Sequence, residues 1–371
     1  MNQPKKSISY SSSGVNYQSL DLLKRLSQTK AKSTAPYLQS TSVGEVGASR
    51  GESAYVWEET DGYRAFVIEG LGTKNLIADE MRKITGKTYY DVVAQDTVAM
   101  IINDLIVVGA EPQVINAYFG LGNSEWIHDE QRTTDLVQGW AKGCELAGVT
   151  WGGGETPGLA GVINPETVDL CGAAVGVIKP KNRLTLGDKL REGDVLILVE
   201  SSGIHANGIS LARAIANQLP ERYATPLKDG TLFGDAILKP TYLYSKMVKG
   251  LFEAGIDIHY MVNVTGHGWR KLMRATQDYR YVLTDIPTPQ PLFDFIQQHS
   301  GNSTEEMYGN FNMGAGFAIY IPENQAAQTQ EVIKKQGFAS WKAGRVEEGE
   351  KEVVIKPLGI SFKGNTLKVR S

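Results

Sequence analysis

The sequence predicts a two-domain protein of mixed α/β or α+β class. Strand-like and helix-like segments are interspersed in both halves of the chain, as in proteins that pack helices against sheets. A length of 371 residues is long for one hydrophobic core and comfortable for two. We expect an N-terminal domain over residues 1–178, a second domain over residues 190–345, and a tail over residues 346–371 that forms a hairpin.

Apolar periodicity predicts the main elements of the first half. The segment from Asp96 to Gly109 begins with a good N-cap residue, ends with a good C′ residue and is apolar on nearly all sides, so we expect a buried helix. Residues 33–53 have the composition of a long loop. The other predicted elements are a strand at 63–68, a helix at 75–85, a strand at 113–119, a helix at 129–148 and strands at 151–156 and 168–178.

The second half repeats this mixture of elements. A buried strand over residues 194–200 opens into a loop and the start of a helix. Leu243, Met247 and Leu251 indicate another helix, and residues 264–269 form a glycine-rich entry to one more. Strands are predicted over residues 311–322 and 338–346.

Composition argues against several classes of protein. The formal net charge of −3 does not favour a nucleic-acid partner. No apolar run approaches the roughly 18–20 residues of a membrane span, and residues 1–17 lack a signal-peptide core, so we expect a cytoplasmic protein. Walker A loops, zinc spacings, serine-hydrolase elbows and the dinucleotide-binding glycine pattern are not found.

The buried helix carries the sharpest chemical signal. Asp96 and Asn103 are seven residues apart and share a face, and Asp104 lies on the same side. Carboxylates and an amide among apolar neighbours are costly without partners, and Mg²⁺ that bridges carboxylates to nucleotide phosphates would be one. The alternative is that Asp96 only caps the helix and Asp104 pairs with a basic residue.

A turn of the sequence Glu-Gly-Leu-Gly-Thr-Lys follows the first strong strand. Backbone N–H groups at such a turn cradle anions, and a lysine neutralises phosphate. Glu69 is a candidate metal ligand, although many ordinary turns share this composition. The candidate nucleotide ligands here are Gly70, Gly72, Thr73 and Lys74.

Three further motifs suggest ligand contacts. Gly153 and Gly154 precede Glu155, a second candidate for magnesium or a substrate amine; the alternative is a plain tight turn. His205 and Asn207 precede a helix in a loop of small residues, where a phosphate or polarised carbonyl could be held, although a lone histidine is more often structural. The glycine-rich entry to the later helix contributes Thr265, Gly266 and Gly268.

Together these strings resemble the aminoimidazole ribonucleotide synthetase family. EGLGTK, NDLIVVGAEP, GGGET, SSGIHANGISLAR, VTGHGW and FNMGAG occur in one order, and the resemblance runs from about residue 9 to residue 345. It implies a homodimer whose N-terminal domains build a shared β-barrel, with an α/β second domain. It also implies an ATP- and Mg²⁺-dependent cyclo-ligase that phosphorylates the amide oxygen of formylglycinamidine ribonucleotide and closes the imidazole ring.

The resemblance also assigns residues to tasks. It implies that Asp96, Asn103, Asp104 and Glu155, with the 69–74 turn, serve ATP and Mg²⁺. His205 and Asn207 match a motif near the reacting centre, where we expect them to act with Asp96. Thr265, Gly266 and Gly268 match the glycine-rich loop of the second domain.

The chain departs from the family pattern at several positions. Ser11 and Ser12 stand where the family usually has Lys-Asp, and Glu69 replaces the usual Asp. Asn263 stands where His is common and His267 where Gly is common; the N-terminal GGFG-type loop and the Glu-Met-Pro after GGET are missing. Two other hypotheses therefore stand beside the cyclo-ligase: another ATP-dependent phosphotransferase of the same superfamily, with a different small substrate, or a non-catalytic relative.

Overall fold

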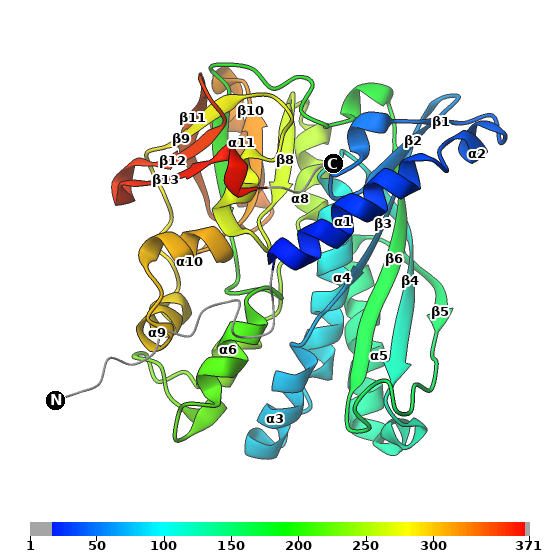
Figure 1. The fold of residues 1–371 in the computed structure, drawn as a ribbon, viewed down its shortest axis with the longest axis vertical. Coiled ribbons are helices and arrows are strands. Elements are labelled where there is room, and N and C mark those ends of the chain that lie inside the picture. Colours follow the sequence, from blue (N-terminus) through cyan, green and yellow to red (C-terminus); the bar gives the residue numbers. More distant parts are fainter. Residues whose placement is uncertain (1–16, 368–371) are drawn as a thin grey trace.

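The computed structural model describes residues 17–367 and contains two β-sheets with helices packed between and around them (Figure 1). Ser11 and Ser12 lie outside the described residues. The central element is helix α4 (Tyr90–Ile106), which packs on the first sheet with one side and faces the second half of the chain with the other. The fold is therefore mixed α/β with two sheet-containing halves, as the sequence predicted.

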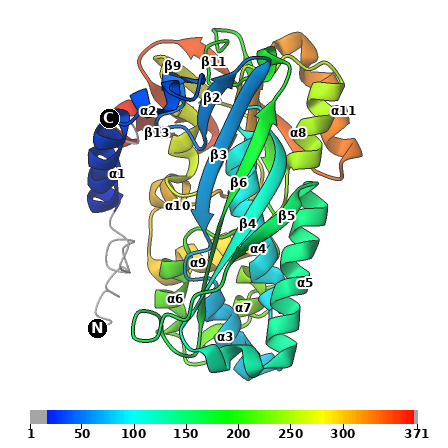
Figure 2. The same ribbon diagram turned by 90° about the vertical axis from the view of Figure 1, so that its right-hand side faces the viewer.

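The first sheet has six strands in the order β1-β2-β3-β6-β4-β5. Neighbouring strands are antiparallel except β4 and β5, which are parallel. Alternate residues of β6 are buried, as in a sheet with one covered face. Figure 2 shows helices α4 and α5 behind this sheet, while its other face carries no helix. The strands are β1 (Gly44–Glu45), β2 (Tyr55–Glu59), β3 (Gly62–Gly70), β4 (Glu111–Leu121), β5 (Thr150–Glu155) and β6 (Val168–Ile178).

The second sheet has seven strands in the order β13-β12-β9-β11-β7-β10-β8. Strand β10 is buried along its whole length, since both of its faces are covered. The last two strands pair antiparallel with each other, and β12 pairs parallel with β9, so the tail continues the second sheet. The strands are β7 (Val195–Glu200), β8 (Tyr260–Asn263), β9 (Tyr279–Leu283), β10 (Ala315–Ile321), β11 (Ser340–Glu348), β12 (Glu352–Ile355) and β13 (Ile360–Lys363).

The remaining helices begin and end where local signals place them. Asp129 caps α5 by accepting a hydrogen bond from the Arg132 N–H, and Gly148 closes that helix in the left-handed conformation. Among the described residues no helix is both long enough and apolar enough to cross a bilayer. The helices are α1 (Tyr17–Lys32), α2 (Pro36–Gln39), α3 (Asn75–Thr85), α5 (Glu130–Ala147), α6 (Ile209–Ala216), α7 (Phe233–Ile237), α8 (Ser245–Glu253), α9 (Pro291–Ser300), α10 (Thr304–Asn310) and α11 (Ala326–Lys335).

Three local predictions were wrong. Helix α4 begins at Tyr90, so Asp96 lies inside the helix and is not its N-cap. Its carboxylate accepts a hydrogen bond from the distant Thr241 N–H instead of from its own helix. Residues 33–53 are not one long loop, because they contain α2, β1 and a short 3₁₀ turn. The glycine-rich segment after β8 leads into a six-residue 3₁₀ turn (Gly268–Met273), not into an α-helix.

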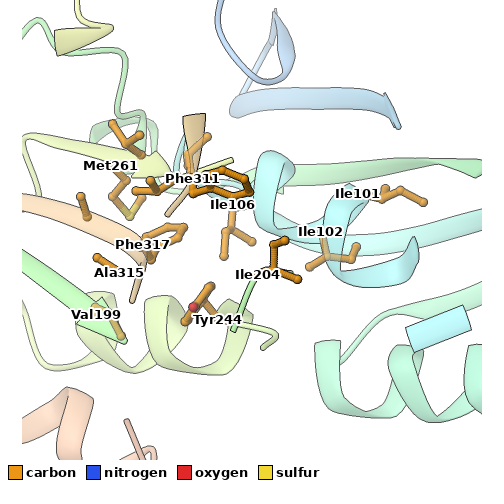
Figure 3. Close-up of a cluster of buried hydrophobic side chains, with 14 of the residues drawn as sticks. Ile101, Ile102, Ile106, Val199, Ile204, Tyr244, Met261, Phe311, Ala315 and Phe317 are labelled. Carbon is orange, nitrogen blue, oxygen red and sulfur yellow. The ribbon is translucent and has the colours of Figure 1, made fainter. Parts of the chain in front are cut away.

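A continuous apolar core joins the two halves. Figure 3 shows Ile102 and Ile106 of α4 on one side and Tyr244, Phe317 and Val199 of the second half on the other. All of these side chains are buried. Burying such large side chains is worth on the order of 1.5–3 kcal/mol each, so α4 is held firmly between the two sheets. Polar groups on α4 are therefore positioned by a rigid element.

Candidate active site

A cavity of about 330 Å³ lies between the two halves, beside helix α1. It gathers five residues that the sequence singled out, although they come from four separate segments. Glu69 lies near the end of β3, Asp104 lies near the end of α4, Asn207 precedes α6, and Thr265 and Gly266 follow β8. The structure thus brings one part of the predicted site together.

The carboxylates of Glu69, Asp104 and Glu52 line this cavity. The amide of Asn263 donates to Asp104 Oδ1 at 2.7 Å. Burial raises the pKa of Glu69 to about 7, and the charge of Asp104 adds to this effect. Two acidic groups that oppose each other's ionisation are relieved by a cation, and carboxylate oxygens are ligands that Mg²⁺ prefers. The residues present therefore fit a magnesium ion.

The described residues offer only part of a metal's coordination shell. Within residues 17–367 no three His, Cys, Asp or Glu side chains gather in a ready-made metal cluster. Magnesium commonly takes one or two carboxylates and completes its shell with water and substrate phosphates. The carboxylates of Glu69 and Asp104 would accordingly hold the ion together with a phosphate ligand.

The glycine-rich loop after β8 forms another wall of the cavity. The side-chain oxygen of Asn207 accepts a hydrogen bond from the Gly266 N–H at 3.0 Å, which ties the loop before α6 to this wall. His267 adopts a left-handed φ of 69°, and its Nε2 lies 3.3 Å from Asp21 Oδ2 on α1. Burial lowers the pKa of His267 to about 4, so its imidazole is neutral at physiological pH.

Sequence reasoning missed the basic groups of the cavity. Lys271 and Arg274 lie in and directly after the 3₁₀ turn, and Lys24 lies on α1. Arg274 donates to the carbonyl oxygen of Gly51 at 2.8 Å and approaches the Glu52 carboxylate to 3.5 Å. No motif marks these cations; the available signal was two basic residues three apart just after the glycine-rich loop.

Four other predicted site residues form a separate, closed cluster. Lys74 and Asp96 are both fully buried, and Lys74 Nζ lies 2.5 Å from Asp96 Oδ2. The same ammonium donates to the carbonyl oxygen of His205 at 2.9 Å, while Thr241 N–H donates to Asp96 Oδ1 at 2.6 Å. This ion pair joins the first half of the chain to the second, and protein groups surround it.

Asn103 and His205 belong to the same junction. The Asn103 amide donates to the carbonyl oxygen of Tyr242 at 2.8 Å and accepts from the Tyr244 N–H at 3.0 Å. The Nε2 atom of His205 accepts from the Ser202 N–H at 3.3 Å. Burial lowers the pKa of His205 to about 3, with Lys74 adding to the shift, so the imidazole is neutral. These contacts fasten α4 to the second half.

Two glycines of the predicted site are explained by backbone conformation and close packing. Gly72 takes a φ of 74° in the turn from β3 to α3. A Cβ on Gly268 would lie 2.3 Å from the Tyr308 carbonyl oxygen, so this position requires glycine for packing. Neither residue lines the cavity. The nucleotide contacts predicted for Gly70, Gly72 and Thr73, and for Gly268, stay predictions.

The Gly153–Gly154–Glu155 motif also lies outside the cavity. It occupies β5 at the edge of the first sheet, and all three residues are exposed. A Cβ on Gly154 would approach the Ala117 carbonyl oxygen to 2.2 Å, so glycine permits the close pairing with β4. Their predicted roles toward nucleotide and metal stay predictions.

Fold and cavity together define a class of protein with two α/β halves and, between them, a pocket lined by carboxylates and basic side chains. Comparison with known sequences then identifies the family. The N-terminal domain of AIR synthase related proteins matches residues 51–178, and the C-terminal domain matches residues 191–356. The chain therefore belongs to the AIR synthase related family.

Curated relatives match most of the chain. The phosphoribosylformylglycinamidine cyclo-ligase of Methanobrevibacter smithii is 32% identical over 336 residues, which cover 88% of this chain and 91% of the relative. The cyclo-ligase of Nitrosococcus oceani is 36% identical over 283 residues, 75% of each chain.

Solved structures share the fold at lower identity. A HypE-HypF complex gives a TM-score of 0.60 at 14% identity and covers 84% of this chain and 92% of that chain. AaThiL complexed with AMPPCP and TMP gives 0.56 at 15% identity and covers 82% and 87%.

Proposed function

We propose that this chain is a cytoplasmic, magnesium- and ATP-dependent cyclo-ligase that converts formylglycinamidine ribonucleotide into aminoimidazole ribonucleotide in purine biosynthesis. The cavity carries the proposal, because Glu69 and Asp104 line it together with the buried Lys271 between the two matched domains. Curated relatives over most of this length are named cyclo-ligases. The similar AaThiL structure holds an ATP analogue, which supports ATP as the second substrate.

The reaction has two steps. A bond forms between the substrate's amide oxygen and the γ-phosphorus of ATP, while the bond from that phosphorus to the β–γ bridging oxygen breaks and ADP leaves. A nitrogen of the same substrate then attacks the activated carbon, inorganic phosphate departs, and the nitrogen loses a proton as the five-membered ring closes. Because both reacting atoms of the second step belong to one molecule, holding that molecule folded removes much of the entropic barrier.

The chain's own residues supply position and charge. Glu69 and Asp104 would hold Mg²⁺, which supplies charge neutralisation at the phosphates. Asn207 lines the cavity, and its hydrogen bond from the Gly266 N–H fixes the glycine-rich loop as a wall against which a ligand can be positioned. We assign Lys74 and Asp96 to the junction that keeps α4 and the second half in register, because they satisfy each other there.

An assay with purified protein tests this function. Protein, Mg-ATP and formylglycinamidine ribonucleotide should release ADP and form an aminoimidazole product in equal amounts. ADP release with another small amide, but none with this substrate, would favour the alternative phosphotransferase. Nucleotide binding without any turnover would favour a non-catalytic relative.

One observation favours the alternative phosphotransferase. Asn263, where the family commonly has His, binds Asp104, and His267, where the family commonly has Gly, lines the cavity. His267 therefore alters a wall of the cavity directly, and the buried Asn263 acts on that wall through Asp104. Products formed from a panel of small amides and phosphates, compared under identical conditions, decide between the two activities.

We also propose a homodimer in which the uncovered face of the first sheet meets its copy and completes a shared β-barrel. That face exposes 43% of Phe66, 67% of Ile68 and 38% of Val114. Contiguous exposed apolar residues on a sheet mark an interaction surface. Light scattering should give twice the chain mass, and Ile68→Asp should give the single mass; a monomeric parent protein would contradict the dimer.

A further inference from the structure

Lys271 is a buried cation in the cavity that a search of sequence motifs does not reveal. Its ammonium donates to the Thr265 hydroxyl and, at 3.4 Å, to the carbonyl oxygen of Asn263. Both partners are neutral. Within residues 17–367 no carboxylate lies within ion-pair distance of Lys271 Nζ, whereas Lys74 has the Asp96 carboxylate at 2.5 Å.

A buried ammonium without a carboxylate partner is costly for the folded protein. Burial lowers the pKa of Lys271 to about 8, and the more distant Asp104 and Glu69 raise it only in part. The neighbours Leu272 and Met273 are apolar. An apolar side chain at position 271 would likewise avoid the free-energy cost of burying a charge. Groups that destabilise the fold in this way are expected at functional sites, where a ligand compensates them.

The surroundings indicate the charge of that ligand. Arg274, one turn along, is already occupied by Gly51, Ser53 and Glu52. Lys271 is therefore the basic group of this wall that has no carboxylate within ion-pair distance among the described residues. The cavity that it lines also contains Glu69 and Asp104, so an anion at Lys271 would lie beside the proposed metal ligands.

We infer that Lys271 is a catalytic residue that binds the γ-phosphoryl group of ATP and neutralises its charge while it is transferred. The inference rests on the proposed function, because it takes ATP as the phosphoryl donor. In phosphoryl-transfer enzymes metal ions and basic side chains neutralise the charge of the transferred group, and a phosphoryl group held beside Glu69 and Asp104 would lie next to Lys271. Lys271 keeps its proton throughout, and its charge offsets the negative charge of the phosphoryl oxygens.

Nucleotide affinity measured by calorimetry in the presence of Mg²⁺ tests the inference without turnover. The parent protein should bind a non-hydrolysable ATP analogue more tightly than ADP, because only the former has a γ-phosphate. Lys271→Met should lose about tenfold or more of its affinity for the analogue while its affinity for ADP stays within about twofold. Turnover of Lys271→Met should fall about 100-fold or more.

Two controls keep the result interpretable. Lys249→Met removes a surface lysine paired with Glu111 and should leave both affinities unchanged. Lys271→Met without nucleotide should melt at the same temperature as the parent or higher, because an uncompensated buried charge has been removed. If that variant does not fold, Lys271→Gln tests the same loss of charge with a polar side chain.

The outcomes separate this inference from the proposed function. A folded variant, Lys271→Met or Lys271→Gln, that keeps the parent's preference for the ATP analogue overturns the role of Lys271, and so does a folded Lys271→Met variant that melts well below the parent. Loss of the preference in a protein that does not turn over formylglycinamidine ribonucleotide supports Lys271 and refutes the cyclo-ligase. A parent protein that binds neither nucleotide refutes both.

Discussion

Helix α4 places two aspartates in opposite situations only eight residues apart. Asp96 is fully buried and is compensated by Lys74 and the Thr241 N–H. Asp104 lines an open cavity, where Asn263 satisfies one of its oxygens. The same residue type in the same apolar helix thus serves the architecture at one position and is available to a ligand at the other. The difference lies in where the compensating positive charge comes from.

The lysines of the two regions repeat this contrast. Lys74, which the sequence offered as the phosphate-binding group, has its ammonium held by Asp96 and by the carbonyl oxygens of His205 and Lys239. Lys271 is also buried, but its hydrogen-bond partners beside the cavity are neutral. Residue type in a motif therefore does not tell whether a lysine has a counter-charge inside the protein; the packed structure does.

The largest expected effect comes from breaking the closed pair. Lys74→Met leaves Asp96 buried without its cation, which should lower the free energy of unfolding by about 3–5 kcal/mol. Urea denaturation followed by circular dichroism measures this loss. The double variant Lys74→Met/Asp96→Asn should recover most of the stability, because no lone charge remains. A single variant as stable as the parent would show that the pair does not support the junction.

A substitution in the cavity, in contrast, should lower the activity and leave the stability nearly unchanged. Asp104→Asn keeps the shape of the side chain and its contact with Asn263 but removes a charged ligand for Mg²⁺. Turnover should fall about 100-fold or more, with the unfolding free energy changed by less than about 1 kcal/mol. Asp91→Asn, on an exposed position of the same helix, is the matched control. Equal turnover of Asp104→Asn and the parent would remove Asp104 from the metal site.

Local elements were predictable because their signals are local. Helix α3 (Asn75–Thr85) and strand β6 (Val168–Ile178) have the bounds that periodicity predicted, and the Asp129 and Gly148 caps of α5 were recognisable from residue type. The start of α4 was missed because an aspartate near the first apolar run imitates a cap. The true partner of that aspartate is a backbone N–H 145 residues away.

The composition of the site was less predictable than the elements that carry it. Glu69 and Asp104 were named as candidates, but spacing in the sequence could not separate Asp104 from Asp96, because both lie on one apolar helix. Lys271 was missed altogether, since burial without a counter-charge is a property of the packed structure. Glycine motifs pointed to close backbone approaches, and at Gly154 that approach is to a neighbouring strand.

The smallest expected effect is a pH dependence of stability and nucleotide affinity that arises from Lys271 in the cavity. The pKa of Lys271 is lowered from 10.5 to about 8, chiefly by burial, so the ligand-free folded protein loses this proton between those values while the unfolded chain keeps it. The unfolded state then binds more protons, and this group's contribution to stability rises as the pH increases above about 8. Affinity for a γ-phosphate requires the charged form, so it should change in the opposite direction.

Binding measured from pH 7 to pH 9.5 resolves this prediction. The preference of the parent protein for an ATP analogue over ADP should decline above about pH 8, by at most about tenfold per pH unit. Lys271→Met should show no such decline, which separates Lys271 from other groups that titrate in this range. The Lys74–Asp96 pair provides the contrast, because each of its two charges has its counter-charge inside the protein. A decline of the same slope in Lys271→Met would assign the effect to a different group and would weaken the distinction between the two regions of α4.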